Sequence, residues 1–390
     1  MKTVLLQSTG AILFLLVAGT TFGNENEELW YEIAAGGTGV LQGSPGASGA
    51  SIDSTFDPSI SFDVELTVRT PKSGTAYVSF ESGAGEGINA NIPTFSGFND
   101  DADDNFNLRP SEAWYEYAFG EKVRLRGGKI DITTDFDTNA VANDETEQFL
   151  SGGFVNNLAA AFPDDNSLGA MLWVSQNDFL DFGFGFADAA ADWDNAFDNP
   201  FFIAEIGLKS NIADRQGNYR FYGWHNSKDH IRLDLLDDLD LLDDPDFLGN
   251  SFASNYGFGI SADQEIAEGV TLFARYGLQR GSVSEIGQAW SAGLEISGKF
   301  GRREDDSFGL AYGQAIIGKN LKSLLREAGV DPGNEQRLEV YYRIKANDYL
   351  GISPNLQWVK NPGGDKDINS VWAFGVRAQF NLSSQDWRKN

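Results

Sequence analysis

Apolar and polar residues alternate strictly along many segments of the chain. Between residues 59 and 69 every second side chain is apolar, from Ile60 to Val68, and the side chains between them are polar or charged. Residues 337–345 repeat this pattern. Successive side chains of a strand point to opposite faces, so each segment predicts a strand with one apolar and one polar face. A soluble sandwich alternates in the same way, so one strand alone does not identify the fold.

Sixteen segments of this kind are predicted as strands. They are residues 29–40, 58–69, 74–82, 111–119, 122–129, 168–174, 180–187, 202–208, 218–225, 255–262, 270–278, 289–297, 307–314, 336–346, 349–358 and 370–382. Connections after odd-numbered strands are mostly long, such as 83–110 and 130–167, and those after even-numbered strands are short. Outer-membrane barrels have short periplasmic turns and long outer loops, and a soluble sandwich has no reason to keep this parity.

The chemistry of the two faces supports a membrane barrel. Aromatic side chains gather on the apolar faces near strand ends, as at Tyr115, Phe184 and Phe374, whereas the opposite faces carry charge, Gly and Ser. An apolar outside and a polar inside suit lipid around the barrel and water within it. The sequence therefore predicts an all-β fold, a transmembrane antiparallel β-barrel of sixteen strands, wide enough for an aqueous channel.

Composition narrows the function. The 390 residues include no Cys, only two His, and 57 Asp+Glu against 29 Lys+Arg, for a net charge of −28. Without Cys there is neither a disulfide nor a thiolate metal site. So acidic a surface repels phosphate, which argues against nucleic acid as a partner. Two His and no nucleophile motif argue against a zinc or Ser-His enzyme, so we predict no catalytic residue, cofactor or metal.

The first residues predict a signal for secretion. Lys2 precedes an apolar run at 11–18, and Thr21-Phe22-Gly23 offers small residues for cleavage. The run is too short to span the hydrocarbon layer as a helix. We predict a signal peptide at 1–23 and one barrel domain at 24–390.

Two stretches of the chain resemble one known family. The first holds RPSEAWYE at 109–116 and LRGGK at 125–129. The second holds EVYYR at 339–343, PNLQWVKNPGGD at 354–365 and GVRAQF at 375–380. These motifs are similar to the carbohydrate-selective porin (OprB) family. The resemblance implies a sixteen-stranded channel for passive diffusion of small sugars in the outer membrane of a Gram-negative bacterium.

In sixteen-stranded porins the third long connection commonly folds into the lumen and narrows it. By that analogy, Asp131, Asp135, Asp137, Asp144 and Glu145 are expected at or near the constriction. Strand alternation predicts inward-pointing Glu112, Glu116, Arg124, Arg126, Glu205, Arg220, Arg275, Glu295, Glu339, Arg343 and Arg377. Groups of both signs can bond sugar hydroxyls. The alternative for each charge is a wall group that is paired with its neighbour and only solvates the lumen.

Three aromatic residues are also predicted to point inward and to stack on sugar rings. They are Trp114, Tyr222 and Trp224. For Trp114 and Trp224 the alternative is a place in the lipid-facing aromatic girdle, since a shift of one residue in register reverses the face.

Other features suggest no chemistry of their own. The acidic runs at 99–105 and 234–246 lie in predicted outer loops and could bind Ca²⁺, but they lack EF-hand spacing, and a solvated loop is the simpler interpretation. His225 and His230 are a weak metal motif. Residues 319–328, followed by Gly329, predict a short helix in the seventh outer loop.

Several alternatives stay open at this point. The channel could serve organic acids or cations, or the barrel could be the scaffold of an enzyme or adhesin. A soluble secreted β-protein is a further alternative. The expected contacts are small sugars, outer-membrane lipid and lipopolysaccharide, and the assembly could be a monomer or a homotrimer.

Overall fold

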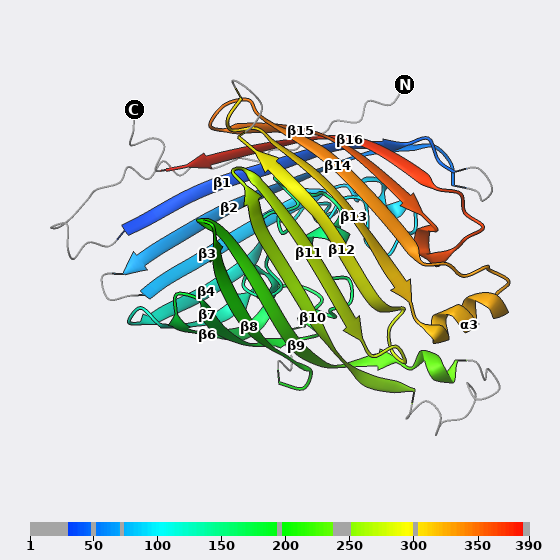
Figure 1. The fold of residues 1–390 in the computed structure, drawn as a ribbon, viewed down its shortest axis with the longest axis horizontal. Coiled ribbons are helices and arrows are strands. Elements are labelled where there is room, and N and C mark those ends of the chain that lie inside the picture. Colours follow the sequence, from blue (N-terminus) through cyan, green and yellow to red (C-terminus); the bar gives the residue numbers. More distant parts are fainter. Residues whose placement is uncertain are drawn as a thin grey trace, which may run out of the picture.

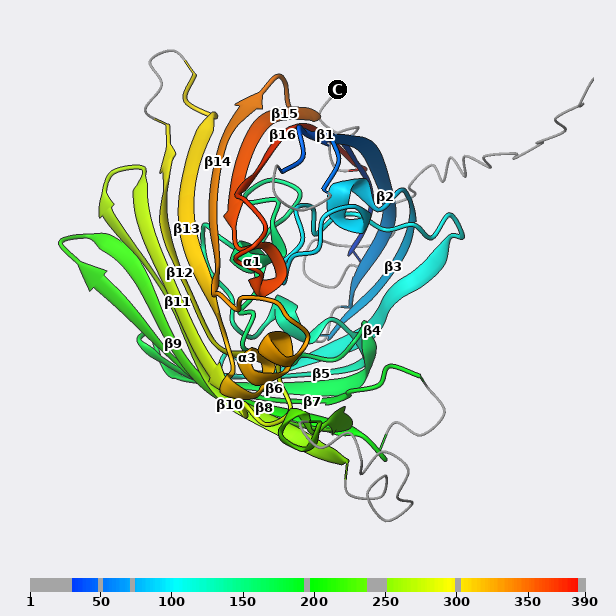
Figure 2. The same ribbon diagram turned by 90° about the vertical axis from the view of Figure 1, so that its right-hand side faces the viewer.

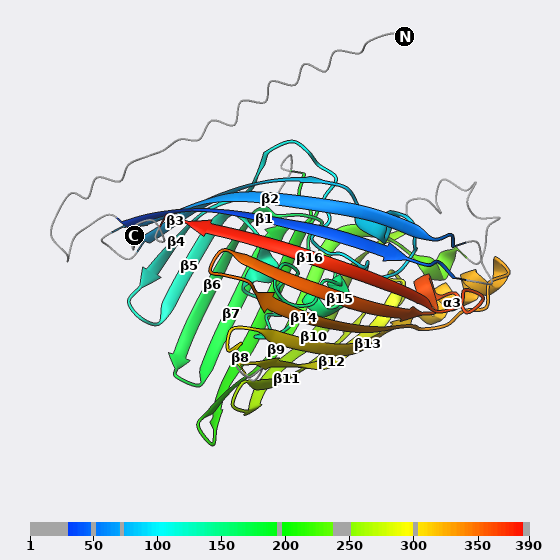
Figure 3. The same cartoon turned by 90° about the horizontal axis from the view of Figure 1, so that it is seen from above.

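The sixteen predicted strands are all present and close into one barrel. The computed structural model describes residues 30–47, 52–70, 74–192, 197–236, 251–298 and 303–384. Within these ranges each strand pairs antiparallel with its sequence neighbour, and β1 pairs with β16 to close the ring (Figures 1 and 3). The strands are β1 (Trp30–Ser44), β2 (Thr55–Thr70), β3 (Gly74–Ala84), β4 (Arg109–Phe119), β5 (Val123–Ile130), β6 (Ser167–Asn177), β7 (Leu180–Asp188), β8 (Pro200–Ile212), β9 (Arg215–Ile231), β10 (Phe252–Ala267), β11 (Val270–Gln279), β12 (Ile286–Ser297), β13 (Ser307–Ile317), β14 (Glu335–Lys345), β15 (Leu350–Lys360) and β16 (Val371–Ser383).

The largest differences from prediction are at the strand ends. The connection predicted at 209–217 shrinks to 213–214, because β8 and β9 stay paired as far as Ile212 and Arg215. Ala213 and Asp214 both have left-handed backbone, with φ of 54° and 61°, as a tight two-residue hairpin requires. Backbone pairing thus continues into polar sequence, where side-chain alternation no longer marks a strand.

The two faces of the barrel have the predicted orientation. Phe184, Phe258 and Phe374 lie on the outside, and Phe258 is 62% exposed. Long connections leave one end of the barrel and short turns leave the other. Among the described residues, no helix has both the length and the apolar character to cross a membrane.

Short helices occupy the connections. They are η1 (Gly87–Ala90), η2 (Ile132–Thr134), α1 (Gly152–Val155), η3 (Leu233–Leu235), α3 (Lys319–Glu327) and η5 (Pro362–Gly364). The helix predicted at 319–328 is therefore confirmed as α3, which lies at the long-loop end (Figure 1). Gly329 follows it with a φ of 81°, a left-handed conformation that favours glycine at a helix end.

Two long loops fold into the barrel. The connection predicted at 130–167 was expected to do so; it spans residues 131–166 in the structure, and Figure 2 shows its helix α1 inside the ring of strands. Residues 85–108 also enter, which was not predicted. Both loops bury apolar side chains against the inner wall, for example Phe98 and Phe149. Strand alternation had predicted a polar inner face. The inner face is not uniformly polar, because the wall under these loops contributes apolar partners such as Phe273.

Candidate functional site: the lumen and the loop that narrows it

The narrowing loop, residues 131–166, begins with a short capped turn. The side chain of Asp131 accepts hydrogen bonds from the Thr133 amide at 2.8 Å and the Thr133 hydroxyl at 2.7 Å, which starts η2. This turn brings Asp135 to the wall at β5, and Asp137 follows two residues later. We call residues 132–137 the strap.

At one end of the strap lies a four-residue charge cluster. Arg124 Nη1 and Arg126 Nη2 each lie 3.0 Å from Glu116 Oε2. The same guanidinium groups contact Asp135, at 3.4 Å from Arg124 and 2.7 Å from Arg126. Glu116 and Arg126 are direct cross-strand partners of β4 and β5, which explains their contact. Arg124 keeps 43% of its side chain exposed, so the cluster presents donors and acceptors to solvent.

A charged pocket adjoins this cluster. Its volume is about 220 Å³, and its lining includes Arg124, Asp135, Asp181, Lys209 and Arg220. Lys209 Nζ lies 2.6 Å from Asp181. Arg220 is paired instead with Asp263, at 2.9 Å. Acidic and basic groups therefore alternate around one polar space inside the barrel.

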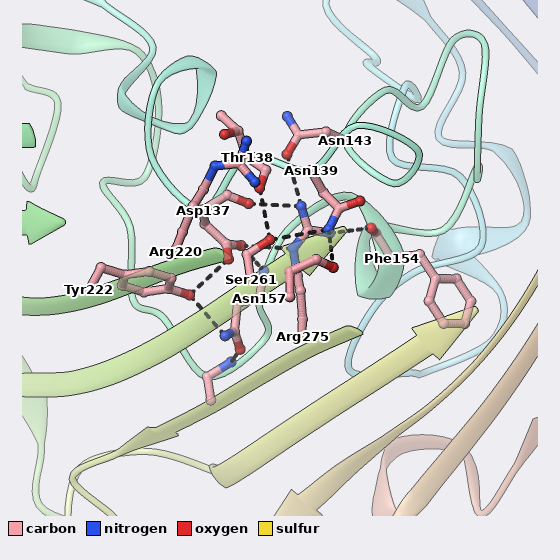
Figure 4. A network of polar contacts seen from close by, with 12 residues as sticks. Asp137, Thr138, Asn139, Asn143, Phe154, Asn157, Arg220, Tyr222, Ser261 and Arg275 are labelled. Atoms are coloured by element: carbon pink, nitrogen blue, oxygen red, sulfur yellow. Dashed lines mark hydrogen bonds and ion pairs between the residues drawn. The ribbon is translucent and has the colours of Figure 1, made fainter. Parts of the chain in front are cut away.

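The other end of the strap, at Asp137, is buried and held by a network of hydrogen bonds (Figure 4). The Asp137 carboxylate accepts hydrogen bonds from the Tyr222 hydroxyl at 3.0 Å and from the main-chain amide of Asn157 at 2.8 Å. Arg275 Nη2 donates to the Asp137 carbonyl at 2.8 Å, and the Asp137 amide donates to Glu205 at 3.1 Å. Asp137 is fully buried with a φ of 57°. These contacts tie the loop to β8, β9 and β11.

The later part of the loop is held by β14 and β16. Glu339 accepts hydrogen bonds from the amides of Leu150 at 2.6 Å and Ser151 at 3.0 Å. Arg377 donates to the carbonyls of Glu145 at 2.5 Å and Gln148 at 2.9 Å. Because the partners are main-chain groups that would otherwise be buried without water, each contact stabilises this path of the loop.

Arg343 and Glu295 complete this side of the barrel. Arg343 Nη2 lies 2.7 Å from Glu147 Oε1, in the same loop. Glu295 accepts a hydrogen bond from the Tyr341 hydroxyl at 2.6 Å. Both side chains therefore point inward, toward groups of the protein.

The three aromatic candidates all lie on the inner face. Trp114 Nε1 donates to Glu112 at 3.0 Å, its ring stacks on Tyr77, and the Arg126 guanidinium lies 4.1 Å from its centroid. Trp224 is buried and packs near Phe201. The lipid-facing alternative for Trp114 and Trp224 is thus wrong, and the rings contact protein groups.

The candidate residues therefore fall into two groups. The open wall consists of β4, β5, Arg220 of β9 and Asp135 of the strap, and it carries partly accessible charges around the pocket. The covered wall, on β8, β9, β11, β14 and β16, carries candidates that are buried under the loop, and we group with it Asp137, the buried strap residue that it holds. The open-wall group is Glu112, Trp114, Glu116, Arg124, Arg126, Asp135 and Arg220, and the covered-wall group is Asp137, Glu205, Tyr222, Trp224, Arg275, Glu339 and Arg377.

Several residues that fix the two loops were not predicted from the sequence. Asn157 bonds Asp137 and Tyr222, and Ser261 bonds Asn139. In the other loop, Gln357 donates to the Phe98 carbonyl at 2.7 Å. The entry of residues 85–108 into the barrel could have been predicted from their apolar content, because Ile88, Ile92 and Phe98 would not suit a loop in water.

Carboxylates on the two loops meet inside the barrel. Desolvation within the barrel raises the pKa of Glu145 to about 8, with repulsion from Asp100 adding to the shift. Desolvation also raises the pKa of Asp101 to about 7, although a hydrogen bond from Ser61 opposes it. Asp100 keeps contact with solvent, yet the enclosing protein raises its pKa to about 6. Charge in this region therefore depends on pH.

The metal motifs considered from sequence are not assembled in the described ranges. No group of three or more His, Cys, Asp or Glu is placed there to hold an ion. In the run 99–105, Asp101 bonds Ser61 and Asp103 pairs with Arg109 at 3.0 Å. Residues 237–250, most of the second acidic run, lie outside the described residues. His225 is exposed, and His230 Nδ1 lies 2.7 Å from the Lys228 carbonyl.

Comparison with known proteins identifies relatives. The model of a family described as "Carbohydrate-selective porin, OprB family" matches residues 48–382. Porin B of Pseudomonas aeruginosa is 26% identical over 155 residues, 34% of each chain. Porin AaxA of Chlamydia trachomatis is 24% identical over 261 residues, 67% of this chain and 52% of its own length. The match thus spans about half or less of these two relatives.

A solved structure shows the same fold. The high-pH structure of Pseudomonas putida OprB superposes with a TM-score of 0.76 at 16% identity, covering 90% of this chain and 94% of the other. At this identity the agreement concerns the fold alone.

Proposed function

The chain belongs to the carbohydrate-selective porin, OprB family, and from this membership we propose that small carbohydrates diffuse passively through its lumen. The barrel fold and the family both point to the outer membrane of Gram-negative bacteria, and to a channel rather than an enzyme. Passive diffusion needs a water-filled path whose width and wall groups select the solute.

One observation supports sugars most directly. Glu116, Arg124, Arg126 and Asp135 place carboxylate acceptors and guanidinium donors side by side at the edge of the 220 Å³ pocket. A sugar hydroxyl both donates and accepts hydrogen bonds, so it can bond both kinds of group. Because the charges are paired, the cluster attracts neither sign of ion strongly, which favours a neutral polar solute.

We propose different roles for the two groups of candidates. The open-wall residues line the path and contact the solute, with Arg124 and Asp135 the most direct. The covered-wall residues position the loop, because the polar ones bond loop groups and Trp224 belongs to the same buried cluster as Phe136 of the strap. Arg343, which pairs with Glu147 of the loop, belongs with this second role, whereas Glu295 holds Tyr341 of the wall. Trp114 and Tyr222 support neighbouring charges, since they contact Arg126 and Asp137, and Trp224 packs near Phe201.

A second solute class has one observation in its favour. Asp100, Asp101 and Glu145 gather on the two loops, and neighbouring carboxylates raise the pKa of both Asp101 and Glu145. Ionised together, they would attract cations. Cations are therefore our second candidate, and charge selectivity in a salt gradient separates them from neutral sugars.

The remaining parts of the proposal concern targeting and surroundings. Residues 1–23 would act as a signal peptide and 24–390 as one barrel domain; the first 29 residues lie outside the described ranges. Lipid and lipopolysaccharide would surround the apolar outer face, and either a monomer or a homotrimer fits.

Liposome swelling tests the function. Vesicles containing the purified protein are diluted into isotonic mono-, di- and trisaccharides, with heat-denatured protein as the control. We expect swelling that slows as the sugar grows. Ion conductance in planar bilayers without swelling in any sugar would contradict the sugar proposal and favour the ionic one.

A further inference from the structure

The buried end of the strap carries an inference about what sets the width of the pore. We propose that Asp137 is the positioning residue of the narrow part of the lumen, and that Gly259 on the barrel wall makes room for the Tyr222 ring that holds it. This inference rests on the proposed function, because it explains which sizes of solute pass.

The conformation of Asp137 needs such support. Its φ of 57° is left-handed, a conformation that is unfavourable for a residue other than glycine, although Asp tolerates it better than most. Asp137 adopts it with both carboxylate oxygens, its amide and its carbonyl hydrogen-bonded. The contacts come from Glu205, Tyr222 and Arg275 on three strands, and from Asn157 in the same loop. Together they specify one position of the strap.

Two wall glycines make this arrangement possible. A Cβ built on Gly259 would lie 2.0 Å from the Tyr222 ring, so the ring occupies the place where a side chain of β10 would be. A Cβ on Gly277 would lie 2.4 Å from Asn157 Oδ1. The Tyr222 ring therefore lies over one inward glycine, and the Asn157 side chain, whose Nδ2 donates to the Tyr222 hydroxyl at 2.9 Å, lies over another. A methyl group at Gly259 would displace the Tyr222 donor, and one at Gly277 would displace the Asn157 side chain that bonds this tyrosine; neither changes any charge.

The strap transmits this position to the charged edge of the pocket. Asp135 is two residues before Asp137 and lies 2.7 Å from Arg126 and 3.4 Å from Arg124. Phe136, between them, is fully buried against the wall, with its ring centroid 5.1 Å from that of Trp173. These three consecutive residues run along the inner wall from β5, which Asp135 contacts, to β9, which Asp137 contacts. Moving Asp137 thus moves the acidic group that faces Arg124.

Four variants test the inference. Asp137→Asn keeps size and backbone preference but removes the charge facing Arg275. Tyr222→Phe removes one hydrogen bond, and Gly259→Ala displaces the ring. Gly39→Ala is the matched control, because a Cβ there meets nothing within 4 Å. Folding is checked first by circular dichroism and heat-modifiable migration in detergent gels.

The readout is the size of the open pore. We expect all three test variants to add a higher conductance level and to pass trisaccharide faster relative to monosaccharide, while Gly39→Ala matches wild type. For Tyr222→Phe, the ratio of time spent at the higher conductance level to time spent at the wild-type level should rise about fivefold. This change corresponds to the loss of one hydrogen bond. Asp137→Asn should give a larger rise.

Failure of this inference is distinct from failure of the proposed function. Folded Asp137→Asn and Tyr222→Phe channels with wild-type conductance levels and sugar ratios would overturn the positioning role, even if Gly259→Ala did not fold. A wild-type channel that conducts ions but passes no sugar would overturn the proposed function, and the conductance levels would still test the strap.

Discussion

The open and covered walls of the lumen use the same kinds of residue for different purposes. Arg124 on the open wall shares Glu116 and Asp135 with its neighbour and remains 43% exposed. Arg275 on the covered wall is buried and donates to the carbonyls of Asp137 and Phe154. Both were predicted from alternation as inward charges. The difference shows that inward orientation alone does not make a residue part of the water-filled path, since a loop can cover it.

The energetics of the two walls should differ accordingly. An exposed ion pair contributes about 0–1 kcal/mol, because water and salt screen it. A buried hydrogen bond to a charged group contributes about 1.5–3 kcal/mol, and its loss leaves the partner without water. Substitutions on the covered wall should therefore move the loop, whereas those on the open wall should change selectivity with the loop in place.

The largest expected effect comes from removing the apolar contact of the covered wall. Phe149 is fully buried, with its ring centroid 5.0 Å from that of Tyr341 and 5.6 Å from that of Phe273. Phe149→Ala should weaken loop docking by about 3–5 kcal/mol, so amide exchange at 149–155 should accelerate roughly 100-fold or more. Phe106→Ala is the control, because Phe106 is 84% exposed in the other loop. Equal exchange in both variants would show that the loop is not held by this core.

A smaller effect is expected from a matched pair of carboxylates. Glu339→Gln keeps the shape but removes the charge that receives the Leu150 and Ser151 amides, and should weaken loop docking by about 1–2 kcal/mol. Glu116→Gln on the open wall should leave docking within about 0.5 kcal/mol of wild type. Current noise from loop movement, recorded on single channels, compares the two. Similar noise in both would remove the distinction between the walls.

A measurement of charge selectivity tests the open wall. Arg124→Gln removes a partly exposed positive charge and leaves Asp135 paired with Arg126 alone, so stability should change by less than about 1 kcal/mol. The reversal potential in a salt gradient should shift toward cation preference. Lys122→Gln, at a short turn outside the lumen, provides the control. An unchanged reversal potential would place Arg124 away from the ion path.

The smallest expected effect is a dependence on pH. Asp100, Asp101 and Glu145 have pKa values raised to about 6, 7 and 8, so they are mostly neutral near pH 5 and mostly charged near pH 9. Cation preference should therefore increase with pH. Because the folded state binds these protons more tightly than the unfolded state, docking of the two loops should lose stability as pH rises through this range.

Glu145→Gln separates these carboxylates from other titrating groups. The variant should lose the upper part of the pH dependence of the reversal potential, around pH 8, and keep the part near pH 6 and 7. A variant that titrates like wild type would exclude Glu145 from the ion path.

The barrel could be predicted from sequence because the membrane imposes a pattern on every strand. Alternation such as that of Ile60 to Val68 follows from lipid on one side and polar surroundings on the other, and it identified all sixteen strands. The orientation of the lumen candidates followed from the same rule. The burial of these candidates could not be predicted from this rule, because Arg124 and Arg275 occupy equivalent inward positions in their strands. Whether a loop covers them depends on tertiary contacts such as Glu339 to Leu150, between residues far apart in sequence.

The manner in which the covered wall holds the narrowing loop has a consequence for the variation of such channels. Arg377 bonds the carbonyls of Glu145 and Gln148, and Glu339 bonds the amides of Leu150 and Ser151. Any amino acid supplies a carbonyl, and any except proline supplies an amide. The loop can therefore change its exposed side chains and keep this attachment, whereas Leu150 and Ser151 are themselves buried. A barrel of this design can acquire a new solute preference through point substitutions in one segment, with its wall unchanged.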